Sequence, residues 1–278
     1  MNSFSLATMR LAMRSVARQN IQNVLITLWG DDGKECSFFS LLPSLYAIRQ
    51  FANGNEDMNL IKESFYKLFN VSYDDFMLLD IPNSTLLDEY QESFLVNYRG
   101  NPSKSLLYAD PFMGKFDIAL SKVGEIPYLD YAKQIEAGGK RAGEFVYLFE
   151  TLSSLCEVLA VKSDLGIKTR CAYENKDKKA LALLIQDYEK LQELLKKFHL
   201  KFHALWKREN KTFGWEIQDA RLGGLICRLN TCARELEAYL KGEIIQIDEL
   251  EEQLLPTGGN DTGLDLNHYI GNMSYCIL

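Results

Sequence analysis

The sequence predicts a mainly α-helical protein, in which an antiparallel helical bundle domain follows a short helix-strand-helix unit. Three long segments place apolar residues at three- and four-residue steps, which is the helical period. Only one buried-strand pattern is evident, near the start of the chain, and no second parallel strand with a crossover helix follows it. The chain has 278 residues, of which 47% are hydrophobic and 12% aromatic, enough to bury a sizeable core.

Residues 1–54 are expected to form the helix-strand-helix unit. Ser5–Arg18 place Leu6, Met9, Met13, Val16 and Ala17 on one helical stripe, with Ser5 as the expected cap. Val24–Trp29 is apolar on both faces, as in a parallel strand covered by helices. A second helix is expected from Ser37 or Ser40 to Phe51, with Pro43 in its first turn. Because one strand needs neighbours on both sides to satisfy its backbone, the unit looks like the last piece of a larger barrel or sheet.

Residues 55–278 are expected to form the helical domain. A stripe of Ile61, Phe65, Leu68 and Phe69 comes first, then a short turn from Ser72 that ends before Pro82. Residues 98–127 predict an ordered, compact loop, because their aromatic side chains need burial. Long helices are predicted at about 143–162, 177–208 and 217–241, and a short one at 248–254 before an irregular tail. The seam of the second long helix consists of Leu181, Leu184, Tyr188, Leu191, Leu195, Phe198, Phe202 and Leu205.

Charge and cysteine usage limit the partners that we expect. The formal net charge is −7 and no basic cluster is present, so a nucleic-acid partner is not expected. No segment approaches the roughly 18 apolar residues of a membrane span, and no secretory signal is evident, so we expect a cytoplasmic protein with no membrane partner. The six cysteines contain no C-x-x-C pair and are interpreted as reduced and mostly buried. No metal or cofactor motif is evident.

The candidate site lies where the predicted strand ends. Trp29 is followed by Asp31, Asp32 and Glu35, so an indole lies beside several carboxylates. A sugar ring packs on an aromatic face while ionised oxygens accept its hydroxyl protons, and this set therefore indicates a sugar pocket. Two plainer roles stay open: Trp29 as a core aromatic at a strand end, and Asp31 and Asp32 as caps of the next helix.

Four motifs in order resemble one enzyme family. They are Trp-Gly-Asp-Asp-Gly-Lys-Glu-Cys-Ser at 29–37, Asp-Pro-Phe-Met-Gly-Lys-Phe-Asp at 110–117, Lys-x-x-Leu-Gly-x-x-x-Arg-x-Ala-Tyr at 162–173, and Asn-Lys-x-x-Gly-Trp-Glu-x-x-Asp-x-Arg-x-Gly-Gly-Leu at 210–225. Together they resemble the C-terminal part of bacterial exo-β-N-acetylglucosaminidases (β-N-acetylhexosaminidases) of glycoside hydrolase family 20. The similarity extends over nearly the whole chain.

The resemblance implies a fold and a set of roles. In that family a (β/α)8 barrel carries the chemistry and, in this branch, a helical domain follows it, so residues 1–54 would be the last helix-strand-helix unit of the barrel. Trp29 would wall the terminal sugar subsite and Asp31 would bind the outer hydroxyls, with Asp32 and Glu35 in support. Family members remove terminal β-linked GlcNAc or GalNAc by substrate-assisted hydrolysis.

The catalytic Asp-Glu pair of the family belongs to the fourth barrel strand, which we do not find in this chain. The pairs Asp88-Glu89 and Asp248-Glu249 lack its strand-end context, so no catalytic residue is assigned. The isolated chain is therefore expected to be inactive, and a separate polypeptide that supplies the front of the barrel is its expected partner. A second copy of the chain is a further candidate partner.

Two other interpretations of the whole chain remain. The first is a non-enzymatic helical interaction or dimerisation module, and the second is an autonomous hydrolase that uses Asp88 or Glu89. Elsewhere, His199 and His203 are interpreted as ordinary helix histidines rather than metal ligands, because no third ligand joins them. Asp219 and Arg221 are expected to form a buried ion pair within the helical domain.

Overall fold

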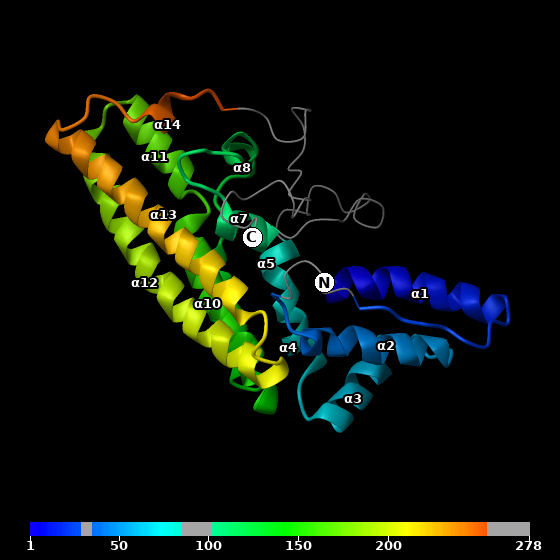
Figure 1. Ribbon diagram of the computed structural model, residues 1–278. Helices are drawn as coiled ribbons and strands as arrows, with labels where there is room; N and C mark the ends of the chain where they lie inside the picture. Colours follow the sequence, from blue (N-terminus) through cyan, green and yellow to red (C-terminus); the bar gives the residue numbers. More distant parts are fainter. Residues whose placement is uncertain (29–34, 85–101, 255–278) are drawn as a thin grey trace. The chain divides into compact units, whose positions relative to one another are not determined.

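The computed structural model describes residues 1–28, 35–84 and 102–254, and these are mainly helical (Figure 1). The predicted fold class is confirmed in its main statement, a helical bundle domain. The chain divides into two compact units. Unit 1 comprises Met1–Tyr98 with Tyr131–Ser153, and unit 2 comprises Arg99–Asp130 with Ser154–Leu278.

Unit 1 is built from short helices. α1 packs along α2, and α2 contacts both α3 and α4. The predicted second helix is confirmed, with Pro43 in the first turn of α2 and a 3-10 turn before it that Ser37 caps. The elements are α1 (Asn2–Arg18), η1 (Phe38–Leu41), α2 (Leu42–Ala52), α3 (Met58–Phe69), α4 (Tyr73–Met77), η2 (Leu78–Asp80), α5 (Ile81–Ser84), most of α9 (Tyr128–Gly139), η4 (Gly143–Phe145) and the first part of α10 (Val146–Lys162).

Asp80 caps the N-terminus of α1 from 77 residues away in the chain. Its carboxylate accepts hydrogen bonds from the backbone N–H groups of Asn2 (2.9 Å) and Ser3 (2.7 Å) and from the Ser3 hydroxyl (2.8 Å). The buried Asn2 side chain extends this network by donating to Ser40 O and accepting from Ser44 Oγ. A carboxylate at a helix N-terminus satisfies unpaired donors and favours the helix dipole. The helix therefore begins at Asn2 rather than at Ser5, the cap that the sequence predicts.

An aromatic cluster forms the core of unit 1. The Phe65 ring meets Tyr46, Tyr73 and Phe76 edge to face, with centroids 5.3–5.9 Å apart. Phe76 also contacts Phe149 of α10. Of the predicted α3 stripe, Ile61 and Phe65 are buried, but Leu68 is 61% exposed. Only part of that stripe therefore faces the core.

The predicted strand is not formed in the described part of Val24–Trp29. Residues 21–28 are irregular, and the structure assigns no strand to any described residue. Val24, Leu25 and Leu28 are exposed, Leu25 by 87%. A strand needs a neighbour for its backbone groups, and the described residues of this chain offer none. The apolar pattern is therefore present without the pairing that would make it a strand.

Unit 2 is dominated by a long helical hairpin. α12 (Lys178–Glu209) and α13 (Trp215–Lys241) lie side by side (Figure 1), and all eight predicted seam residues of α12 are buried. Asp177 caps α12, as the predicted helix start requires. Gly214 has φ of +94° in the turn between the two helices, a conformation that suits glycine. The remaining elements are α7 (Pro102–Tyr108), α8 (Asp117–Val123), the second part of α10, α11 (Leu165–Glu174) and α14 (Asp248–Glu251).

The segment predicted as a loop at 98–127 is partly helical. α7 and α8 flank an irregular stretch at 109–116, and Tyr108, Phe112 and Phe116 are buried, which confirms the expected burial of the aromatic side chains. α9 and α11 were not predicted, and the short helices after Ser72 continue through Pro82. Proline is compatible with helix there because it occupies the first turn of α5.

The cysteine prediction is only half right. All five described cysteines are free thiols, but Cys36, Cys171 and Cys227 are exposed, while Cys156 and Cys232 are buried. Burial raises the pKa of the Cys232 thiol to about 12.

None of the described helices combines the length and apolarity needed to cross a membrane.

Asp80→Ala tests the tertiary cap. We expect the free energy of unfolding to fall by about 2 kcal/mol, because two backbone donors and one hydroxyl lose a charged acceptor in a buried place. Asp57→Ala, which removes the exposed local cap of α3, is the matched control and should cost about 1 kcal/mol. Urea denaturation followed by circular dichroism measures both, and hydrogen exchange at residues 2–5 should accelerate only in the Asp80 variant. Equal losses of unfolding free energy in the two variants, with unchanged hydrogen exchange at residues 2–5, would contradict the role of Asp80 as the cap of α1.

Candidate functional site

Most of the sequence-predicted sugar site lies outside the described residues. Trp29, Asp31 and Asp32 belong to the 29–34 segment, whereas Glu35 is described and half-buried. Ser37, two residues after Glu35, caps η1, because its Oγ accepts a hydrogen bond from Phe39 N at 3.0 Å. The described residues 21–28, which precede the 29–34 segment in the chain, are exposed except for the half-buried Ile26. The placement of the Trp29 and Asp31 side chains relative to Glu35 stays a prediction.

The two Asp-Glu pairs of the sequence differ in what can be described. Asp88-Glu89 lies outside the described residues. Asp248-Glu249 begins α14, and Glu249 Oε1 accepts from Arg228 Nη2 at 2.7 Å. Glu249 is thus engaged with a cation of α13.

Two buried cations hold the irregular stretch at 109–116 in unit 2. The Lys162 ammonium donates to the carbonyl oxygens of Leu106 and Ala109, and the Arg170 guanidinium donates to those of Phe112 and Leu250, both at 2.6 Å. Burial lowers the pKa of Lys162 to about 8, against the nearby carboxylates that raise it. Backbone carbonyls in an irregular segment need donors once they are buried, and these side chains supply them.

The same contacts join two of the motifs that resemble the family. Asp-Pro-Phe-Met-Gly-Lys-Phe-Asp at 110–117 and Lys-x-x-Leu-Gly-x-x-x-Arg at 162–170 face each other in unit 2. At Gly166, an added Cβ would lie 2.7 Å from Pro111 O, so only glycine permits this approach. These two motifs therefore build a packed polar core.

Asp110 is the most strongly held carboxylate of this core. It accepts from Arg228 Nε at 2.6 Å and Nη2 at 3.1 Å, and from the backbone N–H groups of Phe112 and Met113. Burial alone would raise the pKa of Asp110, but the hydrogen bonds and charge of Arg228, with the two backbone donors, lower it below its usual value. The Arg228 guanidinium also lies 5.5 Å from the Phe112 ring centroid. The pair fixes α13 to the 109–116 stretch.

Asp117, at the start of α8, is held differently. Among the described residues its buried Oδ2 has no hydrogen-bond partner, although its backbone N–H donates to Gly114 O. Burial raises the pKa of Asp117 to about 6, and the charges of Arg170 and Lys162 only partly oppose this. The Asp117 carboxyl therefore loses its proton as the pH rises through about 6, just below neutral.

A third cluster lies at the α12–α13 turn and includes the motif at 210–225. The His203 and Trp215 ring centroids are 4.7 Å apart, and His199 Nε2 lies 2.6 Å from Asp219 Oδ1. The Asp219 side chain is 52% exposed, so the predicted buried ion pair of Asp219 with Arg221 is wrong: Asp219 faces α12 and pairs with a histidine there. Within the described ranges, no group of three or more His, Cys, Asp or Glu side chains could hold a metal ion.

Sequence reasoning missed Asp80, Asp110, Lys162, Arg170 and Arg228 as organising residues. A usable signal existed, because Asp110, Lys162 and Arg170 all occur in quoted motifs. Their partners, however, are mostly backbone carbonyls or residues more than 50 positions away, which no local spacing indicates.

Residues 74–267 match the family described as the Glycoside Hydrolase 20C C-terminal domain. The match covers more than half of the chain and contains three of the four motifs; the one at 29–37 lies outside it. No curated protein matches the chain.

Arg228→Met tests the buried pair with Asp110. We expect a loss of about 3 kcal/mol in the free energy of unfolding, because the Asp110 carboxylate is left buried without its cation. In the double variant Asp110→Asn with Arg228→Met, the amide oxygen still accepts from Phe112 and Met113 and neither charge of the pair remains, so much of the loss should be recovered. Lys241→Met, which breaks the exposed pair with Glu237, is the control and should change stability by less than about 0.5 kcal/mol. A double variant as unstable as the single one would contradict this explanation.

Asp117→Asn tests the buried carboxyl through its pH dependence. The pKa of Asp117 is about 6 in the folded chain against an ordinary 3.8, so the folded state binds the proton more tightly and stability falls as pH rises from about 4 to about 6. The amide is neutral throughout, so the variant should exceed the wild type at pH 7.5 by on the order of 1–2 kcal/mol and approach it at pH 4. Thermal unfolding at several pH values measures this, with Asp187→Asn on α12 as the control. A gain that does not depend on pH would contradict the assignment.

Proposed function

The chain belongs to the family of the Glycoside Hydrolase 20C C-terminal domain, and from this we propose that it supplies the C-terminal part of a β-N-acetylhexosaminidase of glycoside hydrolase family 20. Residues 55–278 form the helical domain in this proposal. Residues 1–54 form the last helix-strand-helix unit of a (β/α)8 barrel, whose other strands come from polypeptide outside this sequence. The complete enzyme removes terminal β-linked GlcNAc or GalNAc.

The observation that carries the barrel proposal is the exposed apolar run at 24–28. Val24, Leu25 and Leu28 face solvent, although the sequence pattern is that of a strand covered on both faces. Neighbouring parallel strands would provide backbone partners and bury these side chains. In a barrel, the segment that follows such a strand lies at the face that carries the active site.

Trp29, Asp31, Asp32 and Glu35 form part of the sugar-binding wall in this proposal. The Trp29 indole packs against the terminal sugar, and the Asp31 carboxylate accepts two of its outer hydroxyls. A sugar with one hydroxyl inverted would leave that carboxylate with an unmatched acceptor, which explains selection among epimers. Asp32 and Glu35 support Asp31.

The catalytic acid and the residue that orients the acetamido group lie outside this chain in the proposal. The acetamido oxygen of the substrate attacks the anomeric carbon, and the acid protonates the leaving oxygen. The engagement of Glu249 with Arg228 supports leaving Asp248-Glu249 out of this role. We also propose a cytoplasmic location, which the five free thiols among the described cysteines support.

A chromogenic β-GlcNAc glycoside tests the proposal. The isolated chain should release no chromophore, and addition of the polypeptide that carries the remaining barrel strands should produce turnover. In that complex Trp29→Ala should lower kcat/KM about 10- to 100-fold, since the sugar loses its aromatic wall, while Trp29→Phe keeps a ring and should lose less.

Two results would contradict the proposal. Turnover by the isolated chain would place the catalytic pair in this sequence. Unchanged kinetics in both Trp29 variants would remove the indole from the sugar site.

A further inference from the structure

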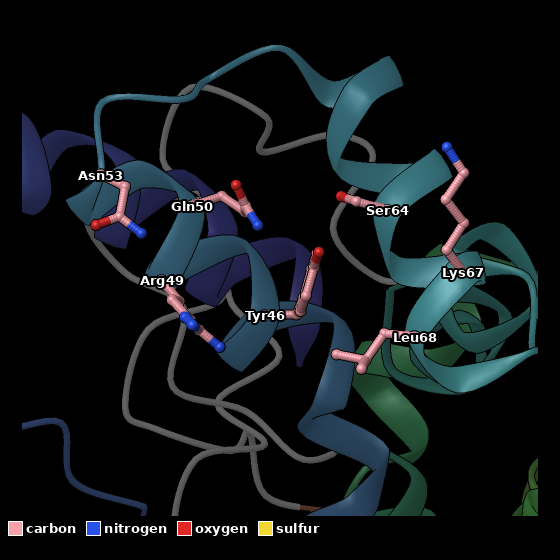
Figure 2. Close-up of a pocket in the computed structure, with 7 residues that line it drawn as sticks. All are labelled: Tyr46, Arg49, Gln50, Asn53, Ser64, Lys67 and Leu68. Atoms are coloured by element: carbon pink, nitrogen blue, oxygen red, sulfur yellow. The ribbon is translucent and has the colours of Figure 1, made fainter.

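Figure 2 shows an open depression between α2 and α3 of unit 1. The Arg49 guanidinium and the Lys67 ammonium at this depression point away from one another, so they do not meet on one ligand. In unit 2, by contrast, charged groups are enclosed together where the segment 247–254, here called the strap, packs on the 109–117 stretch.

Arg170 of α11 holds the second half of the strap. Its Nη1 donates to the carbonyl oxygens of Leu250 at 2.6 Å and Glu252 at 3.3 Å, and its Nη2 donates to Phe112 O at 2.6 Å. The guanidinium thus joins the strap to the 109–117 stretch. The position of the strap depends on where this guanidinium points.

The first half of the strap has anchors of its own. The Tyr173 hydroxyl donates to Glu251 Oε1 at 2.7 Å and accepts from Ile247 N at 3.0 Å. Arg228 donates to Glu249 Oε1. Loss of the Arg170 contacts would therefore loosen the strap without detaching it.

Asp117 lies against the far end of the strap. A Cβ added at Gly114 would be 2.8 Å from Asp117 Oδ2 and 2.6 Å from Leu254 Cδ2, so both side chains pack on the same glycine. Among the described residues, the buried Oδ2 has no hydrogen-bond partner. Because a methyl group donates no hydrogen bond, Leu254 shields this oxygen without satisfying it.

Arg170 has a donor that it does not use. Its Nε is buried and has no hydrogen-bond partner within the described part of the chain. Burial raises the pKa of Asp117, and the charge of Arg170, followed by that of Lys162, opposes the rise, so the guanidinium lies near this carboxyl. An unpartnered N–H group and an unpartnered carboxyl oxygen therefore belong to one cluster.

The other charged groups around Asp117 are engaged elsewhere or face solvent. Lys162 donates to backbone carbonyl groups, Lys115 lies over the Phe116 ring, and Glu252 is exposed. The remaining carboxylates each accept from a donor: Asp110 and Glu249 from Arg228, Asp164 from Lys168, Asp248 from Gln246, and Glu251 from Tyr173.

We propose that the strap is a pH-dependent latch, closed while Asp117 is protonated and loosened when Asp117 ionises, with Arg170 as the group that changes partners. A neutral Asp117 leaves the guanidinium on the strap carbonyl groups. An ionised Asp117 attracts it, accepts from its free Nε, and draws it away from Leu250 and Glu252. The Leu254 end then lifts and admits water to the carboxylate.

The direction of the pH effect follows from linkage. Opening returns the pKa of Asp117 from about 6 toward its ordinary 3.8, so rising pH favours the open strap. All of these groups lie in unit 2, so the inference does not depend on the proposed glycosidase function.

Amide hydrogen exchange, measured by NMR on the full chain, tests the latch. The N–H groups of Ile247 and Leu250 donate to the Tyr173 hydroxyl and to Ile247 O, so their protection reports a closed strap. After correction for the intrinsic pH dependence of exchange, their protection factors should fall about tenfold from pH 5 to pH 7.5. Amides in the middle of α12 should keep theirs, because the opening is local.

Four variants separate the groups involved. Asp117→Asn cannot ionise and should keep the strap protected at both pH values, whereas Arg170→Lys lacks the fork of donors and should reduce protection severalfold at both. Leu254→Ala lets water reach the carboxyl and should shrink the change to about two- or threefold. Asp164→Asn is the matched control, because Asp164 also has a buried oxygen without a partner among the described residues, and should retain the tenfold change. Circular dichroism establishes that each variant keeps its helical content.

Several results would overturn the inference. Equal protection of the strap amides at pH 5 and pH 7.5 in the wild type would show that the strap does not respond to pH. An equal fall at the α12 amides would assign the change to unfolding of the whole unit. A fall that persists in Asp117→Asn or disappears in Asp164→Asn would assign it to another group, and wild-type protection at pH 5 in Arg170→Lys would remove Arg170 as the anchor.

Discussion

Unit 2 depends on one constraint: an irregular stretch of backbone, 109–116, is packed among helices and its carbonyl groups must find donors inside the protein. Lys162 and Arg170 provide them from two consecutive helices, and Arg228 adds a third anchor through Asp110. An unsatisfied buried carbonyl is costly, so these cations stay buried despite the free energy that their desolvation requires. The close approach at Gly166 follows from the same packing.

This constraint also explains why the motifs at 110–117 and 162–173 take the form they do. Their charged residues look like candidates for catalysis or ligand binding when the sequence stands alone. In the structure Lys162 and Arg170 donate to main-chain carbonyl groups and Asp110 pairs with Arg228. Among the described residues, one oxygen of Asp117, one oxygen of Asp164 and Nε of Arg170 are buried without a hydrogen-bond partner. The family match over 74–267 therefore includes residues whose role in this structure is architectural.

The sequence predicts an element well when the interactions that form the element are local, and poorly when its partners are distant in the chain. The sequence predicts the α12 seam because its period is local and its eight apolar residues are all buried, in a helix that packs on α13 and α11. α11 was missed because it is short and its polar residues, such as Thr169 and Arg170, point inward to tertiary partners. The start of α1 was misplaced because its cap, Asp80, is distant in sequence. Of the sugar site, only Glu35 lies in the described residues, and the strap is joined to Arg170 by contacts across 80 or more positions, which no motif connects.

The exposed apolar run at 24–28 has a consequence for the solution behaviour of the chain. Val-Leu-Ile-Thr-Leu is rich in β-branched residues, contains no charge, proline or glycine, and is largely open to solvent. Segments of this composition stack into intermolecular cross-β structure when copies meet. Self-association of the chain at high concentration would therefore start from this run, and a partner that covers it would act as a solubilising subunit as well as a structural one.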